Sequence, residues 1–289
     1  LYFYSGMADI AFHMADKDYL EAVDGIWDNI VGKKMYLTGG LGSTAHNEAF
    51  GKNYELPNAT AYCETCASIA NCMFNLRMFR LHGEAKYFDV LERSLYNTVL
   101  SGISLSGDQF FYPNVLEADR RGQKRSLWFG CSCCPTNLSR FIPAIPGYVY
   151  ATDEHAIYTN LFISSTSEID FNGKKVELQQ TTDYPWEGEI EIKIEKLETS
   201  DFDLKIRIPG WADGKAVPSD LYKYIDSNKG RVNIKINGAP CTFKKENGYA
   251  ILEHGWKKGD KIKISLPMEV HQVVSHKAVR TNDKLTAVE

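Results

Sequence analysis

The 289-residue sequence lacks an apolar run of the roughly 18 residues that a membrane-spanning helix requires. It also lacks a basic excess, because 33 lysines and arginines face 37 aspartates and glutamates and leave a net charge of −4. Nucleic acids and anionic membranes attract proteins of the opposite charge balance. We therefore predict that neither a nucleic acid nor a membrane is the partner of this chain.

A complete disulfide framework is also missing, because seven cysteines cannot all pair within one chain. The adjacent Cys133 and Cys134 suit a strain-free disulfide poorly. Clustered thiols in a chain of this size indicate metal binding or catalysis in a reducing compartment, so the sequence predicts a cytoplasmic location. No signal peptide is visible, but the chain starts at Leu1 without a methionine, and we expect a fragment whose natural N-terminus lies upstream.

The hydrophobic pattern changes its period near residues 148–153. Before this point apolar residues recur with a helical period, and glycine-rich loops such as 37–51 join the helices in pairs, as in an α/α toroid. After it, apolar and polar residues alternate between Gly, Pro and Asn boundaries, which is typical of an antiparallel β-sandwich. The predicted helices are 16–34, 64–83, 85–104 and 135–153, and the predicted strands are 189–197, 203–211, 231–238 and 260–268.

Two short motifs, CETC at 63–66 and CSCC at 131–134, concentrate metal-ligating atoms. Their outer cysteines could form a structural four-cysteine zinc site, although the gap between the motifs is longer than in a zinc ribbon, where about 15–20 residues are usual. Buried thiols that hold no metal are a second interpretation. Both remain open on spacing alone.

A third interpretation adds the carboxylate of the first motif. Glu64, Cys66, Cys133 and Cys134 would supply one oxygen and three sulfur ligands, a set that zinc accepts in a tetrahedron. A thiol bound to zinc loses its proton, so one of these sulfurs could serve as a nucleophile at neutral pH.

A nucleophile of this kind needs a proton donor for its leaving group, and the segment AHNEAFG offers Glu48, with His46 nearby. A carboxylic acid in a partly apolar pocket, here near Phe50, keeps its proton more readily and can act as a general acid. The alternative is a solvated loop carboxylate with no catalytic role.

The stretch YLTGGLGSTAHNEAFGKNYELPNATAYCETCASIA and, further on, ERSLYN, FFYPNVLE and WFGCSCCPTNLSR resemble glycoside hydrolase family 127, which contains the bacterial β-L-arabinofuranosidases. The resemblance runs in order from about residue 7 to residue 150. It continues more weakly through LKIRIPGW and GYAILEHGWKKGDKIKISLPM, which are similar to the first β-sandwich of the family. The combination of motifs is specific, whereas any one of them alone is not.

The resemblance implies a retaining cysteine glycosidase that releases L-arabinofuranose from β-L-arabinofuranosides, with Cys133 as nucleophile and Glu48 as acid/base. It also implies that Glu64, Cys66, Cys133 and Cys134 hold zinc, and that Glu92 in ERSLYN and Tyr112 in FFYPN contact the sugar hydroxyls. The implied fold class is multidomain α and β: residues 1–150 would be the C-terminal part of an (α/α)6 barrel, and residues 151–289 a β-sandwich with the start of a second sandwich at its end.

The chain departs from the family pattern where the first barrel helices and their sugar-binding histidines are absent, and where Asn47 replaces a small residue before the acid.

The predicted partner is a carbohydrate, with a homodimer as a further option. The alternatives are a non-catalytic scaffold that binds a carbohydrate or a protein through its β half and holds a structural four-cysteine zinc, and a related glycosidase for another sugar. Glu64 in the ligand set favours the enzyme, whereas Cys63 and Cys131 favour the scaffold.

Overall fold

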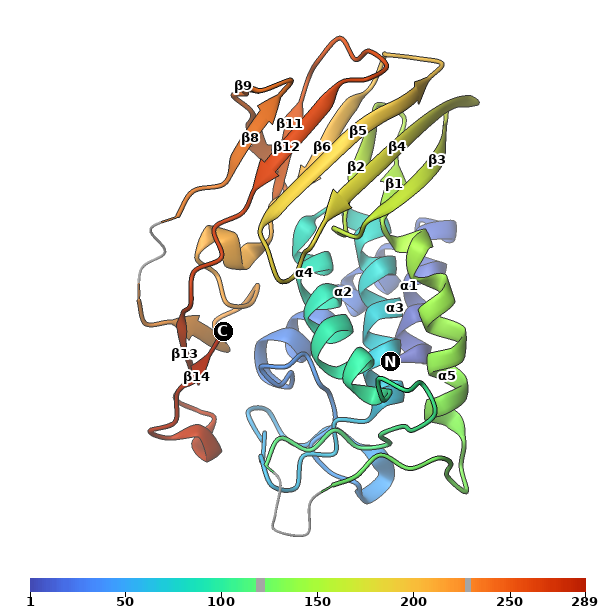
Figure 1. Cartoon of the computed structure of the whole chain (residues 1–289). Coiled ribbons are helices and arrows are strands. Elements are labelled where there is room, and N and C mark those ends of the chain that lie inside the picture. Colours follow the sequence, from blue (N-terminus) through green and yellow to red (C-terminus); the bar gives the residue numbers. More distant parts are fainter. Residues whose placement is uncertain (118–122, 227–229) are drawn as a thin grey trace.

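The computed structural model describes residues 1–117, 123–226 and 230–289 and shows a helical half below a strand half (Figure 1). The last helical turn of the first half ends at Tyr148, and strand β1 begins at Tyr150, which confirms the predicted change of period. All four predicted strands are found, as β5 (Glu189–Leu197), β6 (Asp203–Arg207), β8 (Asn233–Ile236) and β12 (Lys261–Ser265). None of the helices in the described part of the chain is long and apolar enough to cross a membrane.

Helix α3 (Thr65–His82) forms the centre of the helical half, because α1, α4 and α5 all pack against it. Its small alanine, serine and cysteine residues let these neighbours approach closely, and most of its side chains are buried. Gly83, in the left-handed conformation at φ 66°, ends it. The other helices are α1 (Tyr2–Met14), α2 (Lys17–Lys33), α4 (Ala85–Ser94), which continues as a π-helical turn (Leu95–Val99), and α5 (Cys133–Phe141).

Helix α1 has no counterpart among the predicted helices. Large apolar side chains such as Phe3, Phe12 and Met14 are exposed on it, while Ala8 and Ala11 face the core. Leu1, Tyr4 and Met7 also pack against the core, so apolar residues lie on all sides of this helix. The hydrophobic pattern therefore shows no contrast between a core face and a solvent face.

Two sheets face one another across an apolar layer in the strand half. The shared core is built from alternating side chains such as Ile192 and Ile264 on one sheet and Leu204 and Ala250 on the other. One sheet has the order β1 (Tyr150–Thr152), β2 (Ala156–Thr159), β6 (Asp203–Arg207), β11 (Tyr249–Leu252), β10 (Lys244–Glu246), and the other β3 (Ser165–Phe171), β4 (Lys174–Thr182), β5, β12, β8 (Asn233–Ile236), β9 (Ala239–Pro240).

The expectation of purely antiparallel sheets is wrong at one place, where β2 and β6 pair in parallel. Between these two strands the chain builds β3, β4 and β5 of the opposite sheet and then returns. After such a crossover β6 runs in the same direction as β2. A hairpin would instead make the two strands antiparallel. The other described pairs are antiparallel.

A third, small sheet brings the end of the chain back to the helical half (Figure 1). Tyr222 of this sheet donates its hydroxyl to the Met35 carbonyl at 3.1 Å, and Thr281 donates to the Leu56 carbonyl at 2.7 Å. These contacts brace both ends of the loop that carries Glu48. The strands of the sheet are β7 (Tyr222–Tyr224), β13 (Gln272–Ser275) and β14 (Ala287–Val288).

Candidate functional site

Four ligand-bearing side chains, Glu64, Cys66, Cys133 and Cys134, converge so that one donor atom from each lies within 4.8 Å of the others. The sulfurs of Cys66 and Cys134 are 3.5 Å apart, and those of Cys133 and Cys134 are 3.8 Å apart. The Glu64 Oε1 atom lies 3.7 Å from the Cys133 sulfur and 3.8 Å from the Cys134 sulfur. Together these residues are called the thiol–carboxylate cluster.

Two helix N-termini meet at this cluster. Cys66 lies in the first turn of α3, Glu64 is the residue that precedes this helix, and Cys133 and Cys134 open α5. Free backbone N–H groups give a helix N-terminus a partial positive charge, which stabilises thiolates and carboxylates. Each of the four side chains therefore lies where the fold would compensate part of a negative charge on it.

The segment 110–114 holds the start of α3 in place. The backbone N–H of Thr65 donates to the Tyr112 carbonyl at 3.0 Å, and the Thr65 hydroxyl donates to the Phe111 carbonyl at 2.8 Å. The Asn114 amide donates to the Cys63 carbonyl at 3.1 Å. These bonds fix the Tyr112 side chain beside the cluster.

Glu48 reaches the same place from the opposite loop. It is exposed and lies in a single 3₁₀ turn, in which Asn47 and Glu48 have φ values of 56° and 48°. Asparagine tolerates this left-handed conformation better than most residues. The hydroxyls of Tyr62 and Tyr112 donate to Glu48 Oε1 at 3.0 and 3.3 Å, and the Cys133 thiol lies 3.2 Å from the same Tyr112 hydroxyl.

The electrostatics of the cluster distinguish its members. Hydrogen bonding from Cys134 and then from the Asn137 amide, at 3.0 Å, lowers the pKa of Cys66 to about 6. Burial raises the pKa of Cys133 to about 12, and burial together with the neighbouring Cys66 charge raises the pKa of Glu64 to about 7. Without a cation, therefore, Cys66 is the member that ionises most readily.

The spacing of the donors fits a metal ion. A zinc–sulfur bond of about 2.3 Å places the corners of a regular tetrahedron about 3.8 Å apart. The measured separations of 3.5 to 3.8 Å agree with this value. Three sulfurs among four donors favour a soft ion such as zinc over magnesium or calcium, which prefer oxygen.

A cavity of about 270 Å³ opens onto the site. Its walls include the two carboxylates, Glu48 and Glu64, together with Tyr62, Cys66 and Phe50. Phe50 gives the cavity the apolar side that the sequence predicts for the surroundings of Glu48. The volume is close to the lower end of the range of about 300–1,000 Å³ for small-molecule sites.

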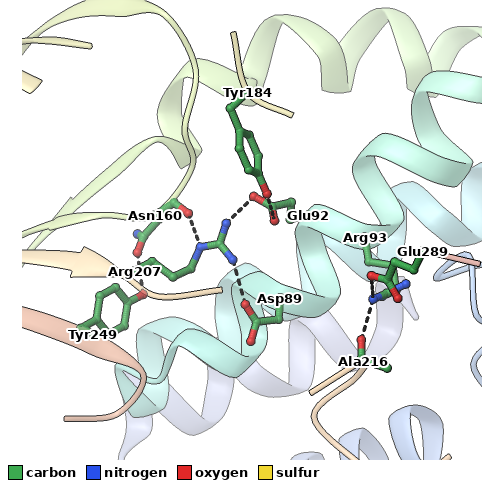
Figure 2. A network of polar contacts seen from close by, with 9 residues as sticks. All are labelled: Asp89, Glu92, Arg93, Asn160, Tyr184, Arg207, Ala216, Tyr249 and Glu289. Atoms are coloured by element: carbon green, nitrogen blue, oxygen red, sulfur yellow. Dashed lines mark hydrogen bonds and ion pairs between the residues drawn. The ribbon is translucent and has the colours of Figure 1, made fainter. Parts of the chain in front are cut away.

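Glu92, predicted to contact sugar, makes its contacts elsewhere (Figure 2). It is 5% exposed on α4, pairs with the guanidinium of Arg207, and accepts the Tyr184 hydroxyl at 2.7 Å. Arg207 is fully buried, also binds Asp89 at 2.8 Å, and donates to the Asn160 carbonyl. This buried ion-pair network joins α4 to the strand half, and the structure does not bring Glu92 into the cluster.

Cys63 and Cys131, the further ligands of the alternative four-cysteine site, lie outside the thiol–carboxylate cluster. Cys63 is fully buried and Cys131 is exposed, and neither belongs to the cluster. Their positions argue against the four-cysteine site, in which both would be ligands.

Sequence reasoning did not find Tyr62 and Asn137, which contact Glu48 and Cys66. Tyr62 lies next to the CETC motif and Asn137 lies one helical turn after Cys133. Their types and spacing carry no metal or catalytic pattern, so only their contacts identify them.

Two family models match this chain: the GH127 catalytic domain of β-L-arabinofuranosidase over residues 3–147 and the GH127 middle domain over residues 156–268. A helical domain with a thiol–carboxylate cluster, followed by such a middle domain, places the chain among the glycoside hydrolases. Within that class, it belongs to glycoside hydrolase family 127.

Relatives of known identity agree. A non-reducing end β-L-arabinofuranosidase of Bifidobacterium longum is 32% identical over 98% of this chain and 42% of its own length. A solved GH127 β-arabinofuranosidase has a TM-score of 0.96 at 49% identity over 99% of this chain and 45% of its own. A GH127 β-L-arabinofuranosidase from Geobacillus stearothermophilus has a TM-score of 0.88 at 36% identity, with 99% and 44% covered. The chain thus spans less than half the length of these relatives.

Proposed function

We propose that this chain carries the nucleophile, the acid/base and the metal ligands of a retaining glycosidase that releases L-arabinofuranose from β-L-arabinofuranosides. The observation that carries the proposal is the arrangement around Tyr112, whose hydroxyl contacts both Cys133 and Glu48. Because both atoms are neighbours of one oxygen, they are at most about 6.5 Å apart. This upper bound is compatible with double displacement, in which the two reacting groups lie about 5–5.5 Å apart.

In the first step, the Cys133 sulfur attacks the anomeric carbon while Glu48 gives its proton to the departing oxygen. In the second step, the Glu48 carboxylate takes a proton from water, the oxygen of that water attacks the same carbon, and the bond to sulfur breaks. Glu64, Cys66, Cys133 and Cys134 would hold zinc, which when bound keeps the thiolate ionised and makes the sulfur a better leaving group.

The remaining assignments also belong to this proposal. The helices before residue 150 would be the C-terminal part of an (α/α)6 barrel, and residues 151–289 a β-sandwich domain. Tyr112 would contact a sugar hydroxyl. The partner would be a carbohydrate, and the protein would act in the cytoplasm, alone or as a homodimer.

The proposal is tested with nitrophenyl glycosides of several sugars and the protein at its natural length. Nuclear magnetic resonance shows the configuration of the released sugar. Hydrolysis of the β-L-arabinofuranoside with retention of configuration supports the proposal. Hydrolysis only of a glycoside of another sugar would instead identify the protein as a related glycosidase. Tight binding of arabinan fragments without turnover of any glycoside would favour a scaffold instead.

A further inference from the structure

We propose that Tyr62 is a further positioning residue for this reaction: it anchors one oxygen of Glu48, so that the transferable proton lies on the other. The inference rests on the proposed function, since it assigns a role to a neighbour of the acid/base. Both phenol donors converge on the same atom, because Tyr62 and Tyr112 lie 3.0 and 3.3 Å from Glu48 Oε1.

This convergence distinguishes the two carboxylate oxygens. An oxygen that accepts two hydrogen bonds uses both of its lone-pair sites, so a proton bound to Glu48 is directed to Oε2. Within the part of the chain that the structure describes, no hydrogen bond to Oε2 is found. Oε2 is therefore the atom free to give a proton to the leaving oxygen and later to take one from water.

Glu48 needs such an anchor because its backbone offers little restraint. It is exposed and lies at the end of a single 3₁₀ turn, His46–Glu48. A free glutamate side chain samples many rotamers, and fixing it costs up to about 2 kcal/mol of side-chain entropy. The hydroxyl contacts supply the restraint that the loop does not.

The two tyrosines do not share this task equally. The Tyr112 hydroxyl also lies 3.2 Å from the Cys133 sulfur, and it has only one proton to donate. When Cys133 is a thiolate, the two anionic acceptors compete for that proton. Among the described residues, the Tyr62 hydroxyl donates to Glu48 and contacts no sulfur, so it is the donor that holds Glu48 throughout the reaction.

Tyr62 is well placed to act as an anchor. Its ring is half-buried against that of Tyr112, with centroids 6.2 Å apart, and its backbone N–H donates to the Gly42 carbonyl at 3.1 Å. The anchor therefore belongs to the rigid segment that leads into α3, whereas Glu48 belongs to the opposite loop. The hydrogen bond fastens the two sides of the cavity together.

The test compares Tyr62→Phe with the parent protein on two β-L-arabinofuranosides, one with a nitrophenol and one with an alkyl alcohol as leaving group. The alkyl alcohol needs the acid in the first step and the nitrophenol does not. We expect kcat/KM to fall at least about 10-fold further for the alkyl substrate, with zinc content unchanged. The matched control is Tyr36→Phe, which also loses a buried hydroxyl contact, to the Pro57 carbonyl, but lies outside the site.

Equal losses on both substrates, or no loss, would overturn the inference. Crystal structures of Tyr62→Phe and the parent protein give an answer that does not require turnover. A Glu48 side chain that leaves its position in the variant supports the anchor, and one that stays in place refutes it. If the parent protein hydrolyses no furanoside, the proposed function fails while the structural comparison still decides the role of Tyr62.

Discussion

The three sulfurs of the cluster are chemically alike but have different neighbours. Cys133 is half-buried and contacts the Tyr112 hydroxyl, whereas Cys134 is fully buried and the buried Cys66 accepts the Asn137 amide. An attacking atom must be reached by substrate, and a spectator ligand need not be. Accessibility therefore supports the proposal that Cys133 is the nucleophile, which the family resemblance also implies.

Replacing the sulfurs one at a time should separate their roles. We expect Cys133→Ser to abolish turnover, because a hydroxyl is far less nucleophilic than a metal-bound thiolate. Cys134→Ser should mainly weaken metal binding, with activity partly restored at high zinc. Cys241→Ser, outside the cluster, is the control. Mass spectrometry after trapping with a reactive arabinofuranose analogue should find the label on Cys133, and a label on Cys134 or Glu64 would contradict the assignment.

The environment of Cys66 predicts a titration in the metal-free protein. Its folded-state pKa of about 6 lies below that of a free thiol, about 8.5, so the thiolate forms as the pH rises through about 6. The stability that it contributes is present above the free-thiol pKa and is lost as the pH falls through about 6.

Absorbance at 240 nm should show one thiolate forming near pH 6 after chelation of metal. Asn137→Ala should move this midpoint upward, because one of the hydrogen bonds that stabilise the thiolate is lost. Asn97→Ala is the control, since Asn97 donates to the Arg93 carbonyl away from the cluster. A midpoint that stays unchanged in Asn137→Ala would show that the amide does not stabilise the charge.

At the level of elements, two contacts separate the candidate site from the ion-pair network: the meeting of two helix N-termini, and the attachment of α4 to the strand half. The N-termini of α3 and α5 meet at the loops, far from the sheets, while α4 is tied to the strand half by Arg207 (Figures 1 and 2). Glu92 belongs to the second contact. Its burial and its two partners give it a structural role, and its predicted contact with a sugar stays a prediction.

Replacing Glu92 distinguishes these roles. Glu92→Leu leaves the fully buried Arg207 with one carboxylate partner, and loss of a partner from a buried pair costs roughly 3 kcal/mol. Urea unfolding should show this loss. Glu168→Gln, in the exposed pair with Lys175, should show none. Unchanged stability with a raised KM would instead restore Glu92 as a sugar contact.

At the scale of the whole molecule, the cluster joins segments that are distant in sequence. The sulfurs of Cys66 and Cys134 meet although 68 positions separate them, and the loop with Glu48 is braced by the end of the chain. A metal ion at this junction would bind the folded protein and not the unfolded chain. Its binding energy would therefore add to the stability of the fold.

Metal removal should accordingly lower the melting temperature. An ion present at 100 times its Kd stabilises the fold by about 2.7 kcal/mol, which corresponds to roughly 5 °C or more for a chain of this size. Differential scanning fluorimetry with and without a chelator measures the change. The double variant Cys66→Ser with Cys134→Ser should not respond, and an equal response in that variant would place the metal elsewhere.

The sequence by itself determined the helical and strand halves, because hydrophobic period is a local property, and its combined motifs identified the family. The motifs CETC and CSCC contain all four residues of the thiol–carboxylate cluster, but their spacing alone did not choose among the possible sets. Only the tertiary structure decided the rest. Helix α1 has apolar residues on all sides, so its sequence does not mark a core face. The parallel pairing of β2 and β6 depends on a crossover, and the contacts of Tyr62, Asn137 and Glu92 join residues that no local pattern relates. Such contacts are made by packing between distant segments, and local spacing cannot encode them.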